Sequence, residues 1–244
     1  MCKLDIEKAY DHVNWNFLFW LLEKMRFGSK LISWIQWCIS IVSFSVLING
    51  TPFGFFQSFR GLRQEDPLSP YLSVIVMEAF NCLLKRVKEG GFLSGWWFNS
   101  RGVGVEISHL LFAYDTLVFC EPSLNQLTYL SWLLMWFEAM SGLRVNLEKS
   151  KLILVGRVDI VVDLAQEFGC KISVFPSSYL SLPLGAHFKD VVVWDGVEER
   201  LWKRRYISKG GGLTLIRSTL SSMSIYFISL FCIPRRVRLR LEQI

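Results

Sequence analysis

Two aspartates lie within apolar stretches of the chain, where a carboxylate is unexpected. Asp5 stands in the strand-like run 4–6, and Asp115 lies between the apolar runs 110–112 and 117–119. A carboxylate among apolar residues is unfavourable unless it is paired or bound to a metal ion. Carboxylates at the ends of neighbouring strands are ligands for Mg²⁺ in two-metal phosphoryl or nucleotidyl transfer. The alternative is two exposed turn acids with no shared site.

The elements that must position these acids follow from periodicity and turn signals. Asn14 and Asp66 are candidate helix caps, and Asn49-Gly50 between apolar runs predicts a hairpin. Helices are expected at residues 15–25, 29–40, 66–90, 123–140, 161–168 and 213–230. Strands are expected at 4–6, on both sides of the Asn-Gly turn, and at 103–107, 110–112, 117–119 and 152–155. Strands and helices mix without strict alternation, which favours an α+β fold.

Five segments carry the motifs that connect this pattern to a function. They are Lys3-Leu-Asp-Ile-Glu-Lys-Ala-Tyr-Asp11, Gly61-Leu-Arg-Gln-Glu-Asp-Pro-Leu-Ser-Pro70, Phe112-Ala-Tyr-Asp115, Ser141-Gly-Leu-Arg-Val-Asn-Leu-Glu-Lys-Ser150 and Tyr179-Leu-Ser-Leu-Pro-Leu-Gly185. In this order they resemble the catalytic motifs of reverse transcriptases from plant-type LINE (non-LTR) retrotransposons. The last segment is similar to the primer-grip region of that family.

The resemblance implies a two-metal RNA-directed DNA polymerase that uses Mg²⁺ or Mn²⁺. Asp5 and Asp115 match the metal-binding aspartates, and Lys149 matches a lysine near the leaving pyrophosphate. An RNA template and a DNA primer are the implied partners. The implied fold is a polymerase palm, an antiparallel sheet with packed helices around a ferredoxin-like core, at residues 1–185. A connection and partial basic helical thumb follow at 186–244, and the family's fingers are expected to be missing before residue 1.

The second motif and Tyr10 imply a nucleotide-binding region. Tyr10 matches the residue under the incoming sugar that screens out a 2′-hydroxyl, although its plain interpretation is a core aromatic. Arg63 and Gln64 belong to the motif that is usually Arg-Gln-Gly-Asp-Pro, and Gln64 matches a residue near the template base and the incoming nucleotide. Glu65 stands where this motif has Gly, so it adds bulk and negative charge beside phosphates.

The third motif departs from the family at a metal ligand. The family has two adjacent aspartates, and Tyr114 occupies the position of the first. A phenol with an ordinary pKa of about 10 is not a Mg²⁺ ligand at neutral pH. Tyr114 and Glu65 each differ from the expected residue by one nucleotide change. We therefore expect a catalytically inactive polymerase relic.

The charge is uneven along the chain. The formal net charge is +6, and residues 200–244 alone carry nine net positive charges. This basic segment suits a polyanion and supports an alternative function, a non-catalytic nucleic-acid-binding remnant. A solvated basic tail explains the charge equally well. The candidate phosphate-binding residues are Lys203, Arg204, Arg205, Lys209 and Arg217.

Other classes of protein are disfavoured. Six scattered cysteines without a Cys-x-x-Cys pair argue against zinc, and an acidic N-terminus argues against a secretory signal. Residues 31–59 carry no charge, but the Asn-Gly turn and Pro52 interrupt them, so we expect no membrane span. The expected setting is intracellular, in the nucleus or cytoplasm. The sequence leaves the oligomeric state open.

Overall fold

The computed structural model describes residues 1–100, 103–112, 115–156, 161–179 and 182–185. The chain divides into two compact units, residues 1–173 and 174–244. The described part of the second unit is the antiparallel hairpin of β11 (Ser177–Tyr179) and β12 (Leu182–Leu184). The predicted boundary at residue 185 lies within this second unit and stays a prediction.

The first unit mixes helices and strands, so the α+β class is confirmed. Its helices are α1 (Ala9–His12), α2 (Trp15–Lys24), α3 (Ser29–Ser40), α4 (Ser69–Glu89), α5 (Leu124–Ser141) and α6 (Val161–Phe168). Its strands are β1 (Cys2–Glu7), β2 (Ser43–Ile48), β3 (Thr51–Gln57), β4 (Trp96–Ser100), β5 (Val103–Ile107), β6 (His109–Phe112), β7 (Asp115–Val118), β8 (Arg144–Val145), β9 (Lys151–Ile153) and β10 (Lys171–Ser173).

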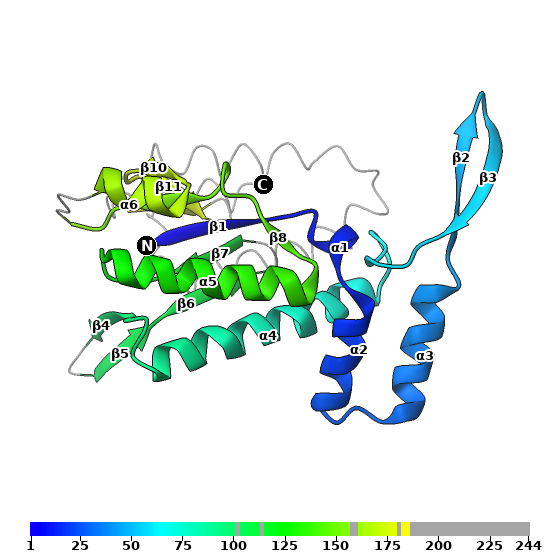
Figure 1. Ribbon diagram of the computed structural model, residues 1–244, viewed down its shortest axis with the longest axis horizontal. Coiled ribbons are helices and arrows are strands. Elements are labelled where there is room, and N and C mark those ends of the chain that lie inside the picture. The colour runs from blue at the N-terminus through cyan, green and yellow to red at the C-terminus, as the bar shows by residue number, and fades with distance from the viewer. Residues whose placement is uncertain (101–102, 113–114, 157–160, 180–181, 186–244) are drawn as a thin grey trace, which may run out of the picture. The chain divides into compact units, whose positions relative to one another are not determined.

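The main sheet has the strand order β10-β9-β1-β7-β6, and β8 pairs with the end of β1. All pairs in it are antiparallel except β9 with β10, which are parallel. Helices α4 and α5 contact each other and run side by side along the sheet (Figure 1). Strand β1 therefore lies in the interior of the sheet, with β7 on one side and β8 and β9 on the other.

Strand β1 alternates between a buried and a partly exposed face. Cys2, Leu4 and Ile6 are buried in the apolar core, whereas Lys3 and Asp5 are half-buried on the other face. Successive side chains of a strand point to opposite faces, so this alternation fixes which residues face the helices. The same core contains the tilted ring pair Phe80–Phe137 from α4 and α5, with centroids 4.7 Å apart.

Two predicted helix starts have different outcomes. The Asn14 Oδ1 accepts hydrogen bonds from the main-chain N–H groups of Asn16 and Phe17, which confirms the cap of α2. The predicted start at Asp66-Pro67 is wrong, because α4 begins at Ser69. Asp66 Oδ1 accepts instead from the Leu68 N–H at 2.8 Å, closing a turn just before the helix.

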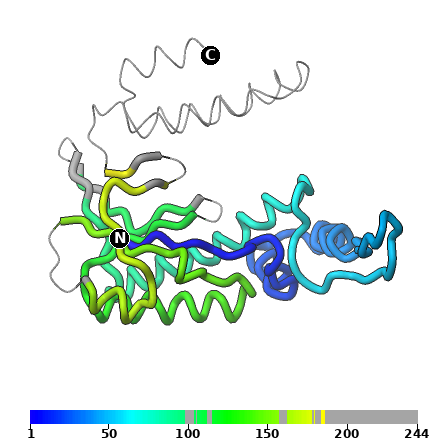
Figure 2. Tube along the Cα trace, turned by 90° about the horizontal axis from the view of Figure 1, so that it is seen from above, coloured from blue at the N-terminus to red at the C-terminus, as the bar shows by residue number. Residues whose placement is uncertain are grey.

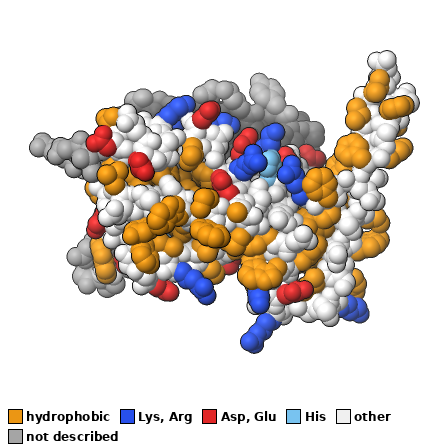
Figure 3. Space-filling view, in the orientation of Figure 1, with side chains coloured by type: hydrophobic (Ala, Val, Ile, Leu, Met, Phe, Trp, Pro, Cys, Tyr) orange, Lys and Arg blue, Asp and Glu red, His pale blue; other side chains and the backbone are white. Residues whose placement is uncertain are grey.

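The uncharged stretch forms α3 and the hairpin of β2 and β3. Asn49 and Gly50 have φ of 49° and 81°, as a two-residue turn with left-handed central residues requires. The hairpin lies beyond the end of β1 that α1 follows (Figure 2) and carries exposed apolar side chains (Figure 3). Phe53 and Phe55 are 71% and 78% exposed. Among the described residues, none of the helices has the length and hydropathy to span a membrane.

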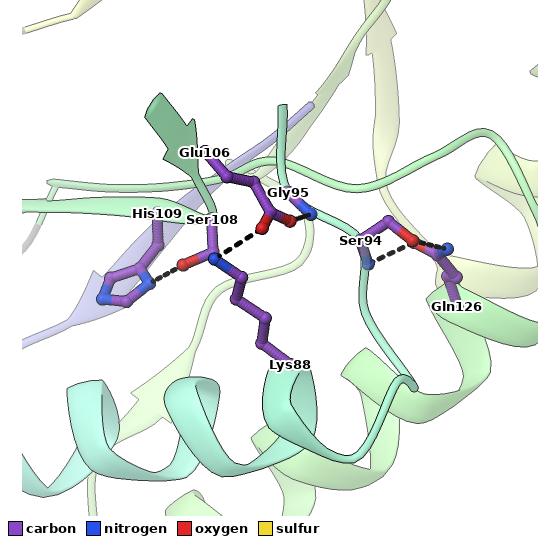
Figure 4. Close-up of polar contacts among 7 residues, drawn as sticks. All are labelled: Lys88, Ser94, Gly95, Glu106, Ser108, His109 and Gln126. Atoms are coloured by element: carbon purple, nitrogen blue, oxygen red, sulfur yellow. Dashed lines mark hydrogen bonds and ion pairs between the residues drawn. The ribbon is translucent and has the colours of Figure 1, made fainter. Parts of the chain in front are cut away.

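A polar cluster holds the start of β6 near α4 (Figure 4). The Lys88 Nζ lies 2.9 Å from Glu106 Oε2, and this hydrogen bond is the main cause that lowers the pKa of Glu106. His109 contacts Ser108 Oγ through Nδ1 at 2.8 Å and Asn81 Oδ1 through Nε2 at 2.7 Å. Burial lowers the pKa of His109, so the ring is neutral at pH 7. The cluster therefore holds the start of β6, the first strand of the β6–β7 hairpin, near α4.

Candidate active site

The two aspartates that the sequence singled out lie opposite each other in the main sheet. Asp5 and Asp115 are Cα partners in the antiparallel pair of β1 and β7. Side chains of directly opposed residues in such a pair point to the same face of the sheet. This is the face of β1 that does not pack into the core. The expected juxtaposition of the acids is thus present, whereas their role as metal ligands stays a prediction.

One cation lies beside this carboxylate pair. The Lys3 Nζ is 3.8 Å from Asp115 Oδ1, and the two side chains are 21% and 37% exposed. Lys3 is two residues before Asp5 on β1, so both side chains point to the same face. An ion pair this long and this exposed contributes little to stability, in the range of about 0–1 kcal/mol. The lysine does, however, offset part of the repulsion between two opposed carboxylates.

The turn at residues 146–150 is hydrogen-bonded to the main chain of Asp5. The Asn146 N–H donates to Asp5 O at 2.8 Å, and the Asp5 N–H donates to Ser150 Oγ at 3.1 Å. The Ser150 hydroxyl in turn donates to Asn146 O at 2.7 Å, and Ser150 is fully buried. No local sequence signal identifies Asn146 or Ser150 as a support of Asp5, although both lie in the fourth motif.

Replacing Ser150 by Ala is expected to destabilise the protein by about 1–3 kcal/mol, because it leaves the partly buried Asp5 N–H without its acceptor. Urea unfolding of the Ser150→Ala variant measures this effect. Ser33→Ala is the matched control, since the Ser33 hydroxyl also donates to a main-chain oxygen four residues earlier but is exposed. Equal unfolding midpoints for the two variants would contradict the proposed support of Asp5.

Lys149 lies in the same turn. Its side chain is exposed, and its N–H donates to the Asn146 main-chain oxygen at 3.2 Å. The turn that carries Lys149 is therefore hydrogen-bonded to the main chain of Asp5. The role of Lys149 near a leaving pyrophosphate stays a prediction.

A pocket of about 600 Å³ gathers the residues predicted to bind nucleotide. Tyr10, Arg63, Gln64 and Glu65 all line it. They come from α1 and from the loop before α4, so the fold joins two motifs that are far apart in sequence. The Gln64 Nε2 also donates to Asp11 Oδ1 at 3.3 Å, which links the two motifs directly. Their roles toward a nucleotide stay predictions.

The loop before α4 is attached to the α1–α2 connection through Gly61. The Gly61 N–H donates to Val13 O at 2.8 Å, and Trp15 Nε1 donates to Gly61 O at 2.7 Å. Gly61 has φ of +83°, and a Cβ built there would lie 2.6 Å from the Asp11 main-chain oxygen. The position therefore requires glycine on both conformational and steric grounds.

Glu65 has a main-chain conformation that favours glycine. Its φ is 66°, in the left-handed region that residues with a side chain seldom adopt. This is the position at which the sequence motif led us to expect Gly. The loop thus keeps a conformation typical of glycine at a position occupied by Glu65. This left-handed conformation costs on the order of 1 kcal/mol for a residue with a side chain.

Several predicted residues lie outside the described part of the chain. They include Tyr114, which falls between β6 and β7 in the sequence. The candidate phosphate-binding residues also do: Lys203, Arg204, Arg205, Lys209 and Arg217.

The described donors suit one divalent cation better than two. Asp5 and Asp115 supply two hard carboxylates on one face. Across the residues that the structure describes, no group of three or more His, Cys, Asp or Glu side chains is placed to hold a metal ion. The resemblance implies a third carboxylate at position 114, and this chain has Tyr there. The residue types therefore do not match a complete two-ion site.

Comparison with known proteins agrees with the family resemblance of the sequence. Residues 1–192 match the family model described as reverse transcriptase (RNA-dependent DNA polymerase). The chain is 46% identical over 70 residues to an uncharacterised mitochondrial protein of Arabidopsis thaliana. It is 28% identical over 158 residues to the transposon TX1 uncharacterised 149 kDa protein of Xenopus laevis. It is 30% identical over 119 residues to a retrovirus-related Pol polyprotein from the type-1 retrotransposable element R2 of Nasonia vitripennis.

These matches cover limited parts of the relatives. The aligned regions are 29%, 64% and 48% of this chain, in the same order. They span 56% of the Arabidopsis protein, 11% of the Xenopus protein and 10% of the Nasonia protein. The chain therefore matches about half of the Arabidopsis protein and about a tenth of the Xenopus and Nasonia proteins.

Proposed function

The chain belongs to the reverse transcriptase (RNA-dependent DNA polymerase) family, and we propose that it is a LINE-type polymerase domain that is defective in nucleotidyl transfer. In this proposal residues 1–185 form the palm and residues 186–244 a partial basic thumb. The observation that carries it is the opposed pair Asp5 and Asp115 on neighbouring strands, with Tyr114 directly before Asp115, where the family has a shared metal ligand.

The defect has two independent sources. Tyr114 removes a carboxylate from a site in which carboxylates must bring two Mg²⁺ ions together. Glu65 adds a negative charge to the pocket that contains Tyr10 and Gln64, and it does so in a left-handed conformation. The Glu65 charge repels anionic phosphates, whereas the missing carboxylate at 114 weakens the binding of the cations that neutralise them. Two lesions in one site are typical of a gene copy that is no longer selected for activity.

The pocket supports a nucleotide-binding role for its polar residues. Tyr10 would lie under the sugar, and Arg63 and Gln64 would contact phosphate or base. Asp5 and Asp115 would hold one Mg²⁺ or Mn²⁺ ion, which neutralises phosphate charge when bound. Because position 114 lacks a carboxylate, affinity for that ion is expected to be weak.

Manganese binding tests the site without relying on activity. Titration of the purified chain with Mn²⁺, followed by electron paramagnetic resonance, is expected to show at most one weak ion, and Asp5→Asn is expected to abolish it. Tyr114→Asp is expected to strengthen binding by at least about tenfold, because it adds a third carboxylate. Asp163→Asn, an exposed acid on α6, is the control that leaves binding unchanged. Retention of the ion by Asp5→Asn would contradict the assignment.

The basic segment favours a second function, non-catalytic binding of RNA or DNA. Residues 200–244 carry nine net positive charges, a surplus that suits a phosphate backbone. If each of the five candidate basic residues contacts one phosphate, log K for single strands falls with log salt at a slope of about −3.5.

A salt titration of the wild type and of one fivefold variant measures this slope. The variant replaces Lys203, Arg204, Arg205, Lys209 and Arg217 by Gln, and its slope is expected to approach zero. Lys24→Gln with Lys30→Gln, at exposed positions of α2 and α3, is the control. An unchanged slope in the fivefold variant would show that these five residues do not contact the phosphates of the nucleic acid.

A further inference from the structure

Two thiols meet across the strands that carry the candidate metal ligands. Cys2 Sγ on β1 lies 3.9 Å from Cys120 Sγ, two residues beyond the end of β7. The register explains the contact, because Cys2 is the Cα partner of Val118 and Cys120 lies diagonally beyond it. Both cysteines are free thiols. Nothing in the proposed polymerase chemistry uses them.

The two thiols differ in access and in acidity. Cys2 is fully buried, whereas Cys120 is only half-buried. The hydrogen bond from the Cys2 thiol is the main cause that lowers the pKa of Cys120 to about 7. The same contact, together with burial, raises the pKa of Cys2 well above its usual value. Cys120 is therefore the more acidic and the more accessible thiol, and Cys2 is its protonated neighbour.

We propose that Cys2 and Cys120 form an oxidative modification site that a peroxide closes to an intramolecular disulfide. The Cys120 thiolate attacks one peroxide oxygen, the O–O bond breaks, and a sulfenic acid forms with release of hydroxide, which takes up a proton as water. The Cys2 sulfur then attacks the Cys120 sulfur. The sulfenic hydroxyl leaves as water with the Cys2 proton. Overall, two thiols are oxidised by two electrons and one peroxide is reduced to two waters.

The two sulfurs are already close in the structure, with Sγ atoms 3.9 Å apart. A disulfide has an S–S distance of about 2.05 Å, so the sulfurs must approach by roughly 1.9 Å. The bond would join β1 to the segment after β7, the two strands that carry Asp5 and Asp115. Because Cys2 is buried, the small oxidant reaches Cys120 first, and the buried neighbour intercepts the sulfenic acid before further oxidation.

Tryptic mapping of the full chain tests the site. Trypsin places Cys2, Cys120 and Cys170 in three separate peptides, residues 1–3, 102–144 and 158–171. After stoichiometric hydrogen peroxide and blocking of remaining thiols, we expect one linked species of peptides 1–3 and 102–144. Its mass is lower than their sum by two hydrogen atoms, and reduction separates it. A linkage of either peptide to 158–171 instead, or irreversible oxidation of Cys120 without a linkage, would overturn the proposal.

Variants distinguish oxidation of the Cys2–Cys120 pair from oxidation of any exposed thiol. Cys120→Ser is expected to abolish the linked species, whereas Cys38→Ser, at an exposed thiol on α3, is expected to leave it unchanged. In Cys2→Ala the pH midpoint for alkylation of Cys120 by iodoacetamide is expected to rise from about 7 toward the ordinary value of about 8.5. An unchanged midpoint in Cys2→Ala would show that the two thiols do not interact.

Discussion

Primer extension on an RNA template with Mg²⁺ is expected to rise by at least roughly 10²–10³-fold when Tyr114→Asp and Glu65→Gly are combined, relative to the unmodified chain. The physical reason is the return of a carboxylate that two ions share, together with the removal of a negative charge beside the nucleotide phosphates. Losing one preorganised electrostatic element slows an enzyme by about 10²–10³-fold, and a shared metal ligand is such an element.

The same assay contains its own control. Adding Asp5→Asn to the double variant is expected to return extension to background, because Asp5 is the opposed partner of Asp115 on the neighbouring strand. Glu65→Gly alone is expected to give a small gain in rate and about 1 kcal/mol of stability, since glycine accepts the left-handed conformation at that position. Equal extension by the unmodified chain and the double variant would contradict the proposed defect.

Replacing Gly61 by Ala is expected to lower the free energy of unfolding by about 2–4 kcal/mol. Two effects add at this position. A residue with a side chain at φ of +83° is strained, and its Cβ would meet the Asp11 main-chain oxygen at 2.6 Å. That oxygen belongs to the backbone, so the loop before α4 must move away from the α1–α2 connection. Nucleotide binding in the adjoining pocket is expected to weaken as well.

Gly50→Ala is the matched control for this prediction. Gly50 has a nearly identical φ of +81°, but no atom lies within 4 Å of a Cβ built there. It therefore measures the conformational strain alone, about 1 kcal/mol. Urea unfolding of both variants gives the steric part by difference. If Gly61→Ala loses no more stability than Gly50→Ala, the loop is not held against Asp11 as the structure indicates.

Local signals in the sequence identified most elements of the first unit. The Asn-Gly pair at 49–50 and the cap at Asn14 specify a turn and a helix start through contacts with residues two or three positions away. Such signals survive in any context because they need no distant partner. Where local signals competed, prediction was less accurate. Asp66 and Pro67 looked like a helix start, but the Asp66 carboxylate closes a turn and α4 begins at Ser69.

The sequence by itself determined the family resemblance and the candidate residues for chemistry: the acids Asp5 and Asp115, the second motif around Gln64, and the two departures at 65 and 114. Only the tertiary structure decided that Asp5 and Asp115 are register partners, that Ser150 holds the main chain of Asp5, and that Cys2 meets Cys120. The reason is that strand order and register depend on pairing between distant segments. Periodicity shows that a segment is a strand, but it carries no information about which strand lies beside it.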